Sequence, residues 1–536
     1  MSEMTTRRDF MRTAAAGMLG IAGGTALAMT ACSPTGTPQE EPLGDTGEQS
    51  WDEEYDIVVV GAGLAGLAAA ITVGTEGNGA TCLLLEKSSQ AAGGGNSQFS
   101  SGSVTYTDDA AAFARYLKSL RGDYDGTPDD ILEVFAERSA GLRDWVLGLG
   151  AAEADMKFTN TDGAKKGEFG ELDDSNTYRY MSFDKKNSQS FKHISQFALS
   201  VVEAHSDVIT EKTEAPVTDL VRDSAGAVTG VVYECGGKEL RARARKGVVM
   251  CCGGFENDPV MRQDYLSAPH AHPVAGIHNT GDGHRICARH GADMWHMHSA
   301  AGFWTNAVSL DGETFCAYRK INKYNGITVG INGRRFYMDY DMAVSGWPGS
   351  DELGPLEANV GCRHGHQQFG GEWPLLPLPA TMWFVYDQDH AEDAYTDGSK
   401  DAVTDGFAVT ASTIGELAAL MGVPADELEE TVAIWNEFCA NGKDTAFHRP
   451  PSTLNPIATA PFYAMKCCCE LLNTDGGPRR NARAQILDTR GEPIGGLYSA
   501  GEFGSLWAHY YQGSCNLSEC LVFGRLAVQE ALGITA

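Results

Sequence analysis

The chain has 536 residues, 43% of them apolar and 21% charged, which is the composition of a globular protein long enough for roughly two to three domains. Its 41 Lys and Arg against 71 Asp and Glu give a formal net charge of −30 at pH 7. So acidic a chain excludes nucleic acid from its expected partners, because phosphate backbones repel it.

The N-terminal segment 1–32 reads as an export signal. Residues 6–12 match a twin-arginine pattern, and the Ala- and Gly-rich stretch 13–29 follows as its modestly apolar core. The next residues resemble a lipobox that ends at Cys32, so we expect this cysteine to carry a lipid anchor, the only membrane contact expected. Cleavage near 26–28 is the alternative and gives a soluble product. Either way we expect export to the cell surface or periplasm.

A strand, a glycine-rich turn and a helix predict a dinucleotide-binding unit. The β-branched run 57–60 is typical of a buried parallel strand, and the turn 61–66 leads from it into an Ala-rich helix. Gly61 permits the sharp bend, Gly63 lets the backbone approach a pyrophosphate, and Gly66 lets the helix pack closely on the strand.

A second strand at 81–85 ends at Glu86, about 20 residues past the turn, where a carboxylate can accept hydrogen bonds from a ribose. The ligand-binding residues expected in this unit are Gly61, Ala62, Gly63, Ala65, Gly66, Glu86 and Lys87. The pattern serves NAD and FAD alike, and it leaves that choice open.

The glycine and hydroxyl run 93–102 comes just after the ribose-binding acid, and its backbone amides can wrap a large ligand. It resembles the GGNS-x-x-S-x-G segment of the FAD-dependent fumarate reductases and 3-ketosteroid dehydrogenases. The resemblance favours FAD and places Gly94, Gly95, Asn96 and Ser97 at the cofactor. It also implies the family's α/β fold, a Rossmann-like FAD-binding domain with an inserted α+β substrate-capping domain.

Further elements follow in chain order. Amphipathic helices are expected at about 128–148 and 190–205. Strands 217–222 and 228–234 read as a β-hairpin, after which 247–251 returns to the sheet.

The resemblance continues along the chain. The turn 252–257 is similar to the family's A-T-G-G-F-E-x-N turn, 279–284 matches its N-T-G-D-G-H motif, and 496–502 matches its C-terminal FAD segment. A helix over 517–527 would face the flavin with its N-terminus. The further FAD contacts expected are Val217, Gly253, Asp282, Glu502, Leu517 and Ser518.

These motifs divide the chain. After the signal we expect a disordered linker at 33–52, the first part of the FAD domain at 53–269, the cap at 270–455 and the second part of the FAD domain at 456–536. Within the cap, aromatic and Pro-rich loops are expected over 304–383, then two helices over 414–422 and 428–436.

The chain has 14 cysteines but no C-x-x-C spacing. Disulfides are common in exported proteins, yet Cys251-Cys252 lies in an apolar strand and 467–469 is a contiguous run, so buried free thiols are the prediction. An iron–sulfur cluster that uses 467–469 with distant cysteines is the alternative.

Three positions bear on the substrate. The resemblance implies that fumarate reductases hold carboxylate-binding cations where this chain has Ala343, Asn473 and Tyr511. A small dicarboxylate needs cationic clamps, so fumarate is not the expected substrate.

Aromatic residues occupy this region instead, and they suit a large, flat, mostly apolar molecule with a carbonyl. Tyr hydroxyls act as acids in the ketosteroid dehydrogenase branch, so Tyr511, Tyr510 and Tyr337 are the catalytic candidates; packing in the core or cap is the alternative for each. His296 and His298 are expected at the surface or in the cap. Arg334 and Arg335 either bind substrate or pair with acids.

The expected function is FAD-dependent reduction of an activated C=C bond in a bulky enone, such as a steroid, a plant lactone or a phenylpropanoid. Hydride would come from flavin N5, and the electrons from an external donor such as a cytochrome or a quinol-linked protein. The alternatives are a 3-ketosteroid dehydrogenase, which runs the chemistry backwards, and a flavin electron carrier without a small substrate.

Overall fold

The computed structural model describes most of the chain between Ser50 and Ile534. The expected signal, most of the expected linker and the expected site residues Gly94, Tyr337 and Tyr510 lie outside the described residues. The described ranges are 50–90, 95–122, 126–164, 169, 172–302, 304–310, 313–316, 326–336, 382–391, 408–508 and 511–534, without the side chains of 304–310, 313–316 and 469–470.

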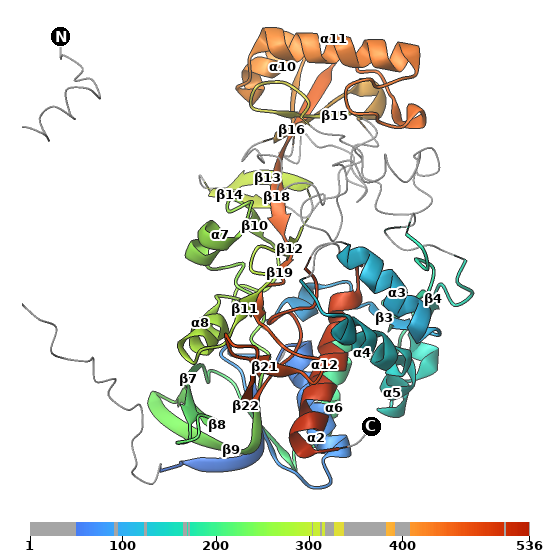
Figure 1. Cartoon of the computed structure of the whole chain (residues 1–536). Helices are drawn as coiled ribbons and strands as arrows, with labels where there is room; N and C mark the ends of the chain where they lie inside the picture. Colours follow the sequence, from blue (N-terminus) through green and yellow to red (C-terminus); the bar gives the residue numbers. More distant parts are fainter. Residues whose placement is uncertain are drawn as a thin grey trace, which may run out of the picture. The chain divides into compact units, whose positions relative to one another are not determined.

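A parallel sheet forms the centre of the fold (Figure 1). Its order is β22-β9-β1-β2-β6, and every neighbouring pair in this order is parallel. The strands are β1 (Glu53–Val60), β2 (Cys82–Leu85), β6 (Ile209–Lys212), β9 (Lys238–Met250) and β22 (Pro493–Ser499). The β-branched end of β1 is fully buried, as expected of a parallel strand covered on both faces.

Three antiparallel strands extend this sheet. β7 (Val217–Arg222) and β8 (Val228–Cys235) form the predicted hairpin, and β8 pairs with the long β9. β21 (Gln485–Leu487) pairs with β22. The C-terminal β22 and β1 therefore belong to one sheet, since both pair with β9.

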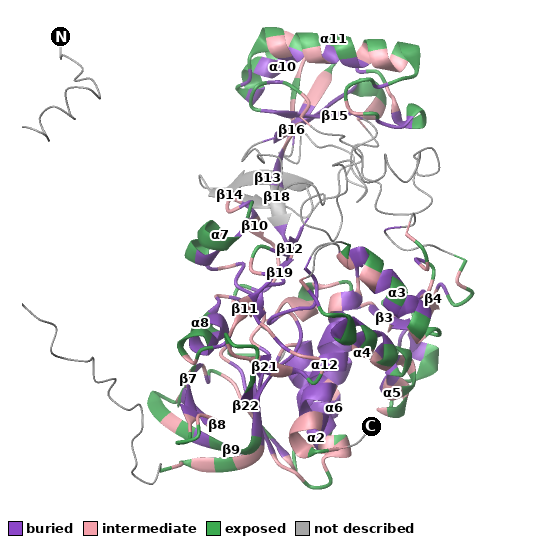
Figure 2. Ribbon diagram, viewed as in Figure 1, coloured by how far each residue is buried: buried purple, intermediate pink, exposed green. Residues whose placement is uncertain are grey.

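Small residues bring three helices together over the sheet. α2 (Leu64–Glu76) packs against α12 (Cys515–Leu532) and α6 (Ile194–Ala204). A Cβ on Gly524 of α12 would lie 2.5 Å from the Ala65 carbonyl oxygen of α2, so this close approach requires glycine. Figure 2 shows α12 buried over most of its length.

The predicted helix over 128–148 is two helices. α4 (Asp129–Ala140) ends at Gly141, where the amide bonds back to Arg138, and α5 (Leu142–Gly148) begins directly after it. Glycine has a poor helix propensity, which explains the break. α6 starts later than predicted because the extended His193 caps it, its ring accepting from the Ser195 amide at 3.1 Å. A further helix, α3 (Ala110–Arg121), packs on α4.

β18 (Phe462–Leu471) is the central strand of a second, seven-stranded sheet. Its members are β10 (His272–Pro273), β13 (Trp304–Leu310), β14 (Glu313–Cys316), β15 (Ile327–Gly330), β16 (Met382–Asp387) and β17 (Ala408–Ala411). The prediction of loops throughout 304–383 was wrong where β13 to β16 lie, since their aromatic and apolar residues pair across the sheet.

The two predicted helices of this region are confirmed as α10 (Ile414–Met421) and α11 (Ala425–Asn441), which pack on each other. β18 follows the expected domain boundary at 455 but pairs with β16 and β17, so this sheet runs across that boundary. The boundaries themselves stay a prediction.

Smaller elements lie outside these two sheets. β3 (Val104–Thr107), β5 (Tyr178–Phe183) and β4 (Met156–Thr159) form a three-stranded sheet. β11 (Met294–Trp295) pairs with β20 (Gly477–Pro478), and β12 (Ala300–Ala301) with β19 (Asn473–Thr474). The helices α7 (Pro259–Tyr265) and α8 (Asp282–Arg289) lie between β9 and β11.

Buried free thiols are confirmed at Cys82, Cys251, Cys287 and Cys520, and Cys467, Cys468 and Cys515 are buried as well. Cys467 and Cys468 are neighbours on β18, and a strand directs adjacent side chains to opposite faces. Within the described ranges no group of three or more His, Cys, Asp or Glu is arranged to hold a metal ion. None of the described helices has the length and apolarity of a membrane span.

Candidate cofactor and active site

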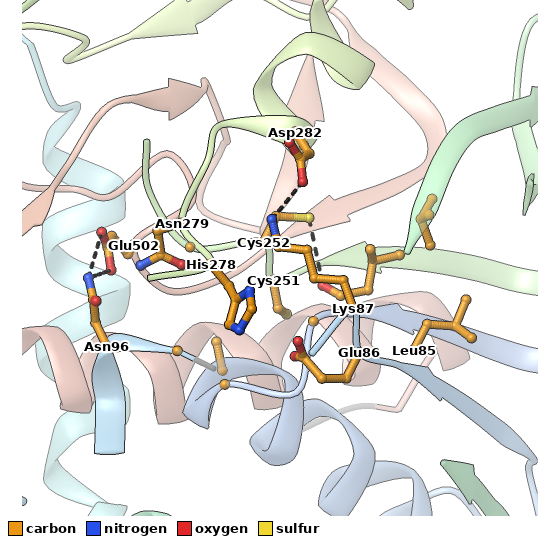
Figure 3. A pocket seen from close by; sticks show the side chains of 18 of the residues that line it. Leu85, Glu86, Lys87, Asn96, Cys251, Cys252, His278, Asn279, Asp282 and Glu502 are labelled. Carbon is orange, nitrogen blue, oxygen red and sulfur yellow. Dashed lines mark hydrogen bonds and ion pairs between the residues drawn. The ribbon is translucent and has the colours of Figure 1, made fainter. Parts of the chain in front are cut away.

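A cavity of about 860 Å³, partly open to solvent, lies at the carboxyl ends of the parallel strands. Its walls include the residues that directly follow β1, β2, β9 and β22, which is where ligands bind in open α/β sheets. Figure 3 shows Glu86 and Lys87 toward one end of this cavity, and Asn96 and Glu502 toward the other.

The glycine-rich turn forms one wall. Gly61 has φ +100°, and a Cβ there would lie 2.4 Å from the Cys251 carbonyl oxygen. A Cβ on Gly66 would lie 1.8 Å from the Gly61 carbonyl oxygen, so the turn and the first turn of α2 touch backbone to backbone. Only glycine fits both positions, as the sequence predicted.

Glu86 stabilises the same turn. One carboxylate oxygen accepts from the Ala62 amide at 2.8 Å, and the other accepts from the Ser88 amide at 2.8 Å. The side chain is buried, yet it lines the cavity directly after β2. Each carboxylate oxygen has a further lone pair, so Glu86 can hold the turn and still accept from a ribose hydroxyl.

Lys87 reaches across the cavity wall to α8. Its ammonium donates to Asp282 Oδ2 at 2.6 Å and to Thr280 Oγ1 at 2.7 Å. This pair joins the segment after β2 to the start of α8, and all three side chains are at least partly exposed. Lys87 and Asp282 therefore contribute mainly to the shape of this wall.

The opposite end is built around Asn96. Its amide nitrogen donates to Glu256 Oε1 at 2.6 Å and to Glu502 Oε2 at 3.1 Å, and its oxygen accepts from the Gly276 amide at 2.9 Å. Four separate segments thus meet at one side chain. The Ser97 hydroxyl accepts from the Leu64 amide at 3.3 Å, next to the N-terminus of α2.

Most of the predicted cofactor residues line this cavity together. They are Gly61, Gly63, Ala65, Glu86, Lys87, Gly95, Asn96, Ser97, Val217, Gly253, Asp282 and Glu502. Ala62 and Gly66 lie behind the wall and support the turn. The Ser518 hydroxyl is buried and donates to the Thr105 carbonyl oxygen at 2.7 Å, and Leu517 is buried beside it.

Sequence reasoning missed several lining residues. Asn279 and His278 face the cavity, as do Cys251, Cys252 and Cys520. Asn279 belongs to the motif that contains Asp282, so the motif itself was a signal for it. The cysteines carried no such signal, because small apolar side chains at these places look like core.

FAD fits this site. Gly95 and Gly63 face each other, a Cβ on Gly95 lying 3.5 Å from the Gly63 Cα, so a ligand can pass close to both backbones. The N-terminus of the 13-residue helix α2 points its amides at the same place, which favours a pyrophosphate.

Tyr511 is the catalytic candidate within the described residues. It is 5% exposed, and its ring meets that of Trp507 edge to face with 5.3 Å between centroids. It lies just before α12, next to Gln512, whose side-chain oxygen accepts from the Tyr116 hydroxyl at 2.6 Å. Tyr511 is not among the residues that line the described cavity.

His296 is buried, so a surface position was wrong for it and its place in the cap stays a prediction, whereas His298 is exposed. The His296 ring stacks on Trp295 with 4.2 Å between centroids, and Nδ1 lies 2.8 Å from the Ser505 carbonyl oxygen. Burial lowers the pKa of His296 to about 4, so it is neutral at pH 7. It holds the Ser505 loop in place.

Arg334 and Arg335 pair with acids. Arg334 contacts Glu427 on α11, and Arg335 is buried with its guanidinium 2.9 Å from Asp444 Oδ2. Arg335 also stacks over the Trp435 ring at 4.7 Å. Of the two readings left open, pairing with acids is the one that these contacts support.

Residues 56–517 match the family described as the FAD binding domain. The chain is 30% identical over 344 residues to the 3-oxosteroid 1-dehydrogenase of Mycobacterium tuberculosis, an alignment that covers 58% of this chain and 57% of that protein. The digoxin reductase of Eggerthella lenta is 25% identical over 585 aligned positions, which cover 97% of this chain and 96% of that protein.

Among solved structures, the 3-ketosteroid Δ1-dehydrogenase of Sterolibacterium denitrificans superposes with a TM-score of 0.70 at 20% identity, covering 90% of this chain and 100% of that one. The likeness confirms the predicted α/β fold. The chain spans little more than half the length of the Mycobacterium tuberculosis relative. With 462 consecutive positions matched and a glycine-walled cavity that fits the ligand, the chain belongs to the FAD-binding domain family, and its cofactor is FAD.

Proposed function

We propose that the protein is an exported reductase of an activated C=C bond in a bulky, mostly apolar enone such as a steroid, a plant lactone or a phenylpropanoid. Bound FAD supplies hydride to the β-carbon of such a substrate. The protein excludes water from the site, orients the substrate carbonyl and delivers a proton to the α-carbon.

The observation that carries this proposal is that neutral side chains occupy two positions where fumarate reductases are expected to hold cations. Asn473 and Tyr511 are both buried. The Asn473 amide donates to the Asp475 carboxyl at 2.9 Å, and Tyr511 packs against Trp507. Neither supplies the positive charge that a small dicarboxylate needs, and both favour a neutral, mostly apolar substrate.

Tyr511 is the described residue that we assign to the substrate carbonyl, as hydrogen-bond donor or as acid. Its buried hydroxyl stands on a ring with apolar neighbours, an environment that suits a phenol acting on an enone. Tyr510 and Tyr337 remain the other candidates.

The names of the two relatives describe opposite directions of reaction, one a dehydrogenase and the other a reductase. The reductase aligns over nearly the whole chain, which favours the reductive direction. The proposal of export rests on the twin-arginine pattern at 6–12. The proposal of a lipid anchor rests on Cys32. The proposal of an external electron donor rests on the sequence, in which no second dinucleotide fingerprint is evident.

The test is anaerobic stopped-flow absorbance of the dithionite-reduced holoenzyme, mixed separately with fumarate, urocanate, a cinnamate, and Δ1- and Δ4-ketosteroid enones. Fast reoxidation by an enone, with fumarate inert, is the expected result. Reoxidation by fumarate would overturn the argument from the missing cations.

A second outcome separates the alternatives. If no acceptor reoxidises the reduced enzyme while saturated ketosteroids bleach the oxidised form, the protein is a 3-ketosteroid dehydrogenase. If neither acceptors nor donors react and a redox protein alone exchanges electrons with it, it is an electron carrier.

A further inference from the structure

Two glutamates from distant segments meet at the end of the cavity opposite Glu86. Glu256 follows β9 and is 0% exposed, and Glu502 follows β22 and lines the cavity. Both accept from one amide nitrogen, that of Asn96, and Figure 3 shows the contact with Glu502. Glu256 was not among the residues expected at the cofactor, and it does not line the cavity.

The two carboxyl groups also border the same small space. Gly254 shows which oxygens approach. A Cβ at Gly254 would lie 2.3 Å from Glu502 Oε1 and 2.4 Å from Glu256 Oε2, so both oxygens border the same small space. A hydrogen bond between two carboxyl groups requires a proton on one of them.

The other hydrogen bonds to the two carboxyl groups come from neutral donors. Glu256 Oε1 accepts from the Asn96 amide at 2.6 Å and is also hydrogen-bonded by the Asn279 amide at 2.5 Å. Glu256 Oε2 has the Thr474 hydroxyl at 3.3 Å, and Glu502 Oε1 accepts from the Thr474 amide at 3.2 Å. Within the described part of the chain, neither glutamate forms an ion pair with Lys, Arg or His.

Electrostatics favours one proton for the pair. Burial raises the pKa of Glu256, and burial together with the charges of Glu256 and Asp475 raises the pKa of Glu502 well above its usual range. Two adjacent carboxylates without a cation cannot both stay ionised in a buried site, so one proton is retained by the pair.

We propose that Glu256 and Glu502 share one proton, and that this carboxyl pair positions Asn96, Asn279 and Glu502 for FAD, which makes FAD binding proton-linked. Glu256 is a positioning residue, because it acts on the cofactor through Glu502 and Asn96. The proposal depends on FAD binding alone and is independent of the substrate.

The sign of the linkage follows from charge and solvation. FAD brings a pyrophosphate with negative charge and displaces water from Glu502, and both effects favour the protonated pair. Binding therefore raises the proton affinity of the pair. FAD affinity is then full at low pH, and it falls as pH rises through the titration of the pair in the apoprotein.

Other charged groups face this pair. Asp475 and the Cys520 thiol interact with Glu502, and negative charge on either favours retention of the shared proton. Arg262 interacts with Glu256, and its positive charge favours loss of that proton. Glu519 acts on Asp475 but is itself paired with Arg480. Asp475 is the main competitor for the proton, since burial raises its pKa well above the usual range.

The experiment measures the Kd of FAD for the apoprotein, by quenching of flavin fluorescence, from mildly acidic to mildly alkaline pH. Wild type should lose affinity by up to about tenfold per pH unit, the slope of one linked proton. In E256Q an amide N–H replaces the shared proton, so this variant should keep the tight binding of the acidic range and lose the pH dependence. A flat wild-type profile, or an unchanged slope in E256Q, would overturn the proposal.

D475N is the matched control, as it removes the competing carboxyl in the same way. It should keep the wild-type slope, and loss of the slope in D475N alone would assign the proton to Asp475 and overturn the proposal. If E256Q fails to fold by circular dichroism, calorimetry of wild type in buffers of different ionisation enthalpy counts the protons directly. Uptake approaching one proton per FAD at alkaline pH is expected, and no uptake contradicts the pair.

Discussion

The β1–α2–β2 unit and the sheet around β18 differ in how strictly each of them requires particular residue types. In the first, function requires particular backbone conformations, so glycines stand at fixed places and a Cβ at Gly66 would meet the Gly61 carbonyl. In the second, any apolar or aromatic side chain of suitable size can pair across strands. The cofactor unit should therefore tolerate far less change than the sheet around β18.

The largest expected effect is from Gly66→Ala. The new Cβ would lie 1.8 Å from a backbone oxygen, so the turn must move, at a cost of more than about 3 kcal/mol. We expect the purified variant to lack FAD, measured as the ratio of flavin to protein absorbance. Gly148→Ala is the control, since nothing lies within 4 Å of its Cβ. Normal FAD content in Gly66→Ala would contradict the close packing of the turn.

Tyr511→Phe tests the residue assigned to the substrate. Loss of the hydroxyl should slow reoxidation by an enone about a hundredfold to ten-thousandfold, the usual contribution of a general acid, while FAD content stays normal. Tyr265→Phe, at a tyrosine 46% exposed on the surface, is the control. An unchanged rate would assign Tyr511 to packing and leave Tyr510 or Tyr337 as the acid.

Asp444→Asn tests whether the region around α11 can be damaged without the cofactor site. Its carboxylate pairs with Arg335 at 2.9 Å, and both side chains are nearly inaccessible, so the variant should lose about 3 kcal/mol of stability and keep its FAD. Differential scanning calorimetry measures the first and flavin absorbance the second. Glu430→Gln, at an exposed pair 3.9 Å from Arg334, is the control and should change neither.

The Asp444–Arg335 pair also predicts that the stability of the protein depends on pH. Burial alone would raise the pKa of Asp444, but the hydrogen bond and charge of Arg335, with backbone amides, lower it below its usual value. A lowered folded pKa gives stability that is present above the unfolded pKa and lost as pH falls through the folded one. The difference in Tm between wild type and Asp444→Asn should therefore shrink at acidic pH, and a constant difference would contradict this.

The smallest effect is expected from Lys87→Ala. Its ion pair with Asp282 is partly exposed, so removal should cost less than about 1 kcal/mol and weaken FAD binding only several-fold. Titration of the apoprotein with FAD measures this. Lys118→Ala, which loses surface pairs with Asp129 and Glu133, should leave the affinity unchanged. A loss of FAD as complete as in Gly66→Ala would show that Lys87 binds the cofactor directly.

The sequence by itself determined the cofactor unit. Strand, turn, helix and acid recur at spacings that backbone sterics and a pyrophosphate impose, so most predicted cofactor residues line one cavity. The hairpin β7–β8 and the helices α10 and α11 were equally predictable, because turn residues and helical periodicity are local signals. The break at Gly141 was missed, since one glycine does not always end a helix.

Only the tertiary structure decided which polar side chains meet. Glu256 and Glu502 are 246 positions apart, and nothing local shows that both contact Asn96. Nothing local in the sequence shows that the ring nitrogens of His296 contact the carbonyl oxygens of Ser505 and Gly126. Periodicity reports how a segment folds on its neighbours in sequence, whereas a buried carboxyl pair depends on loops that the sheet brings together from the ends of different strands.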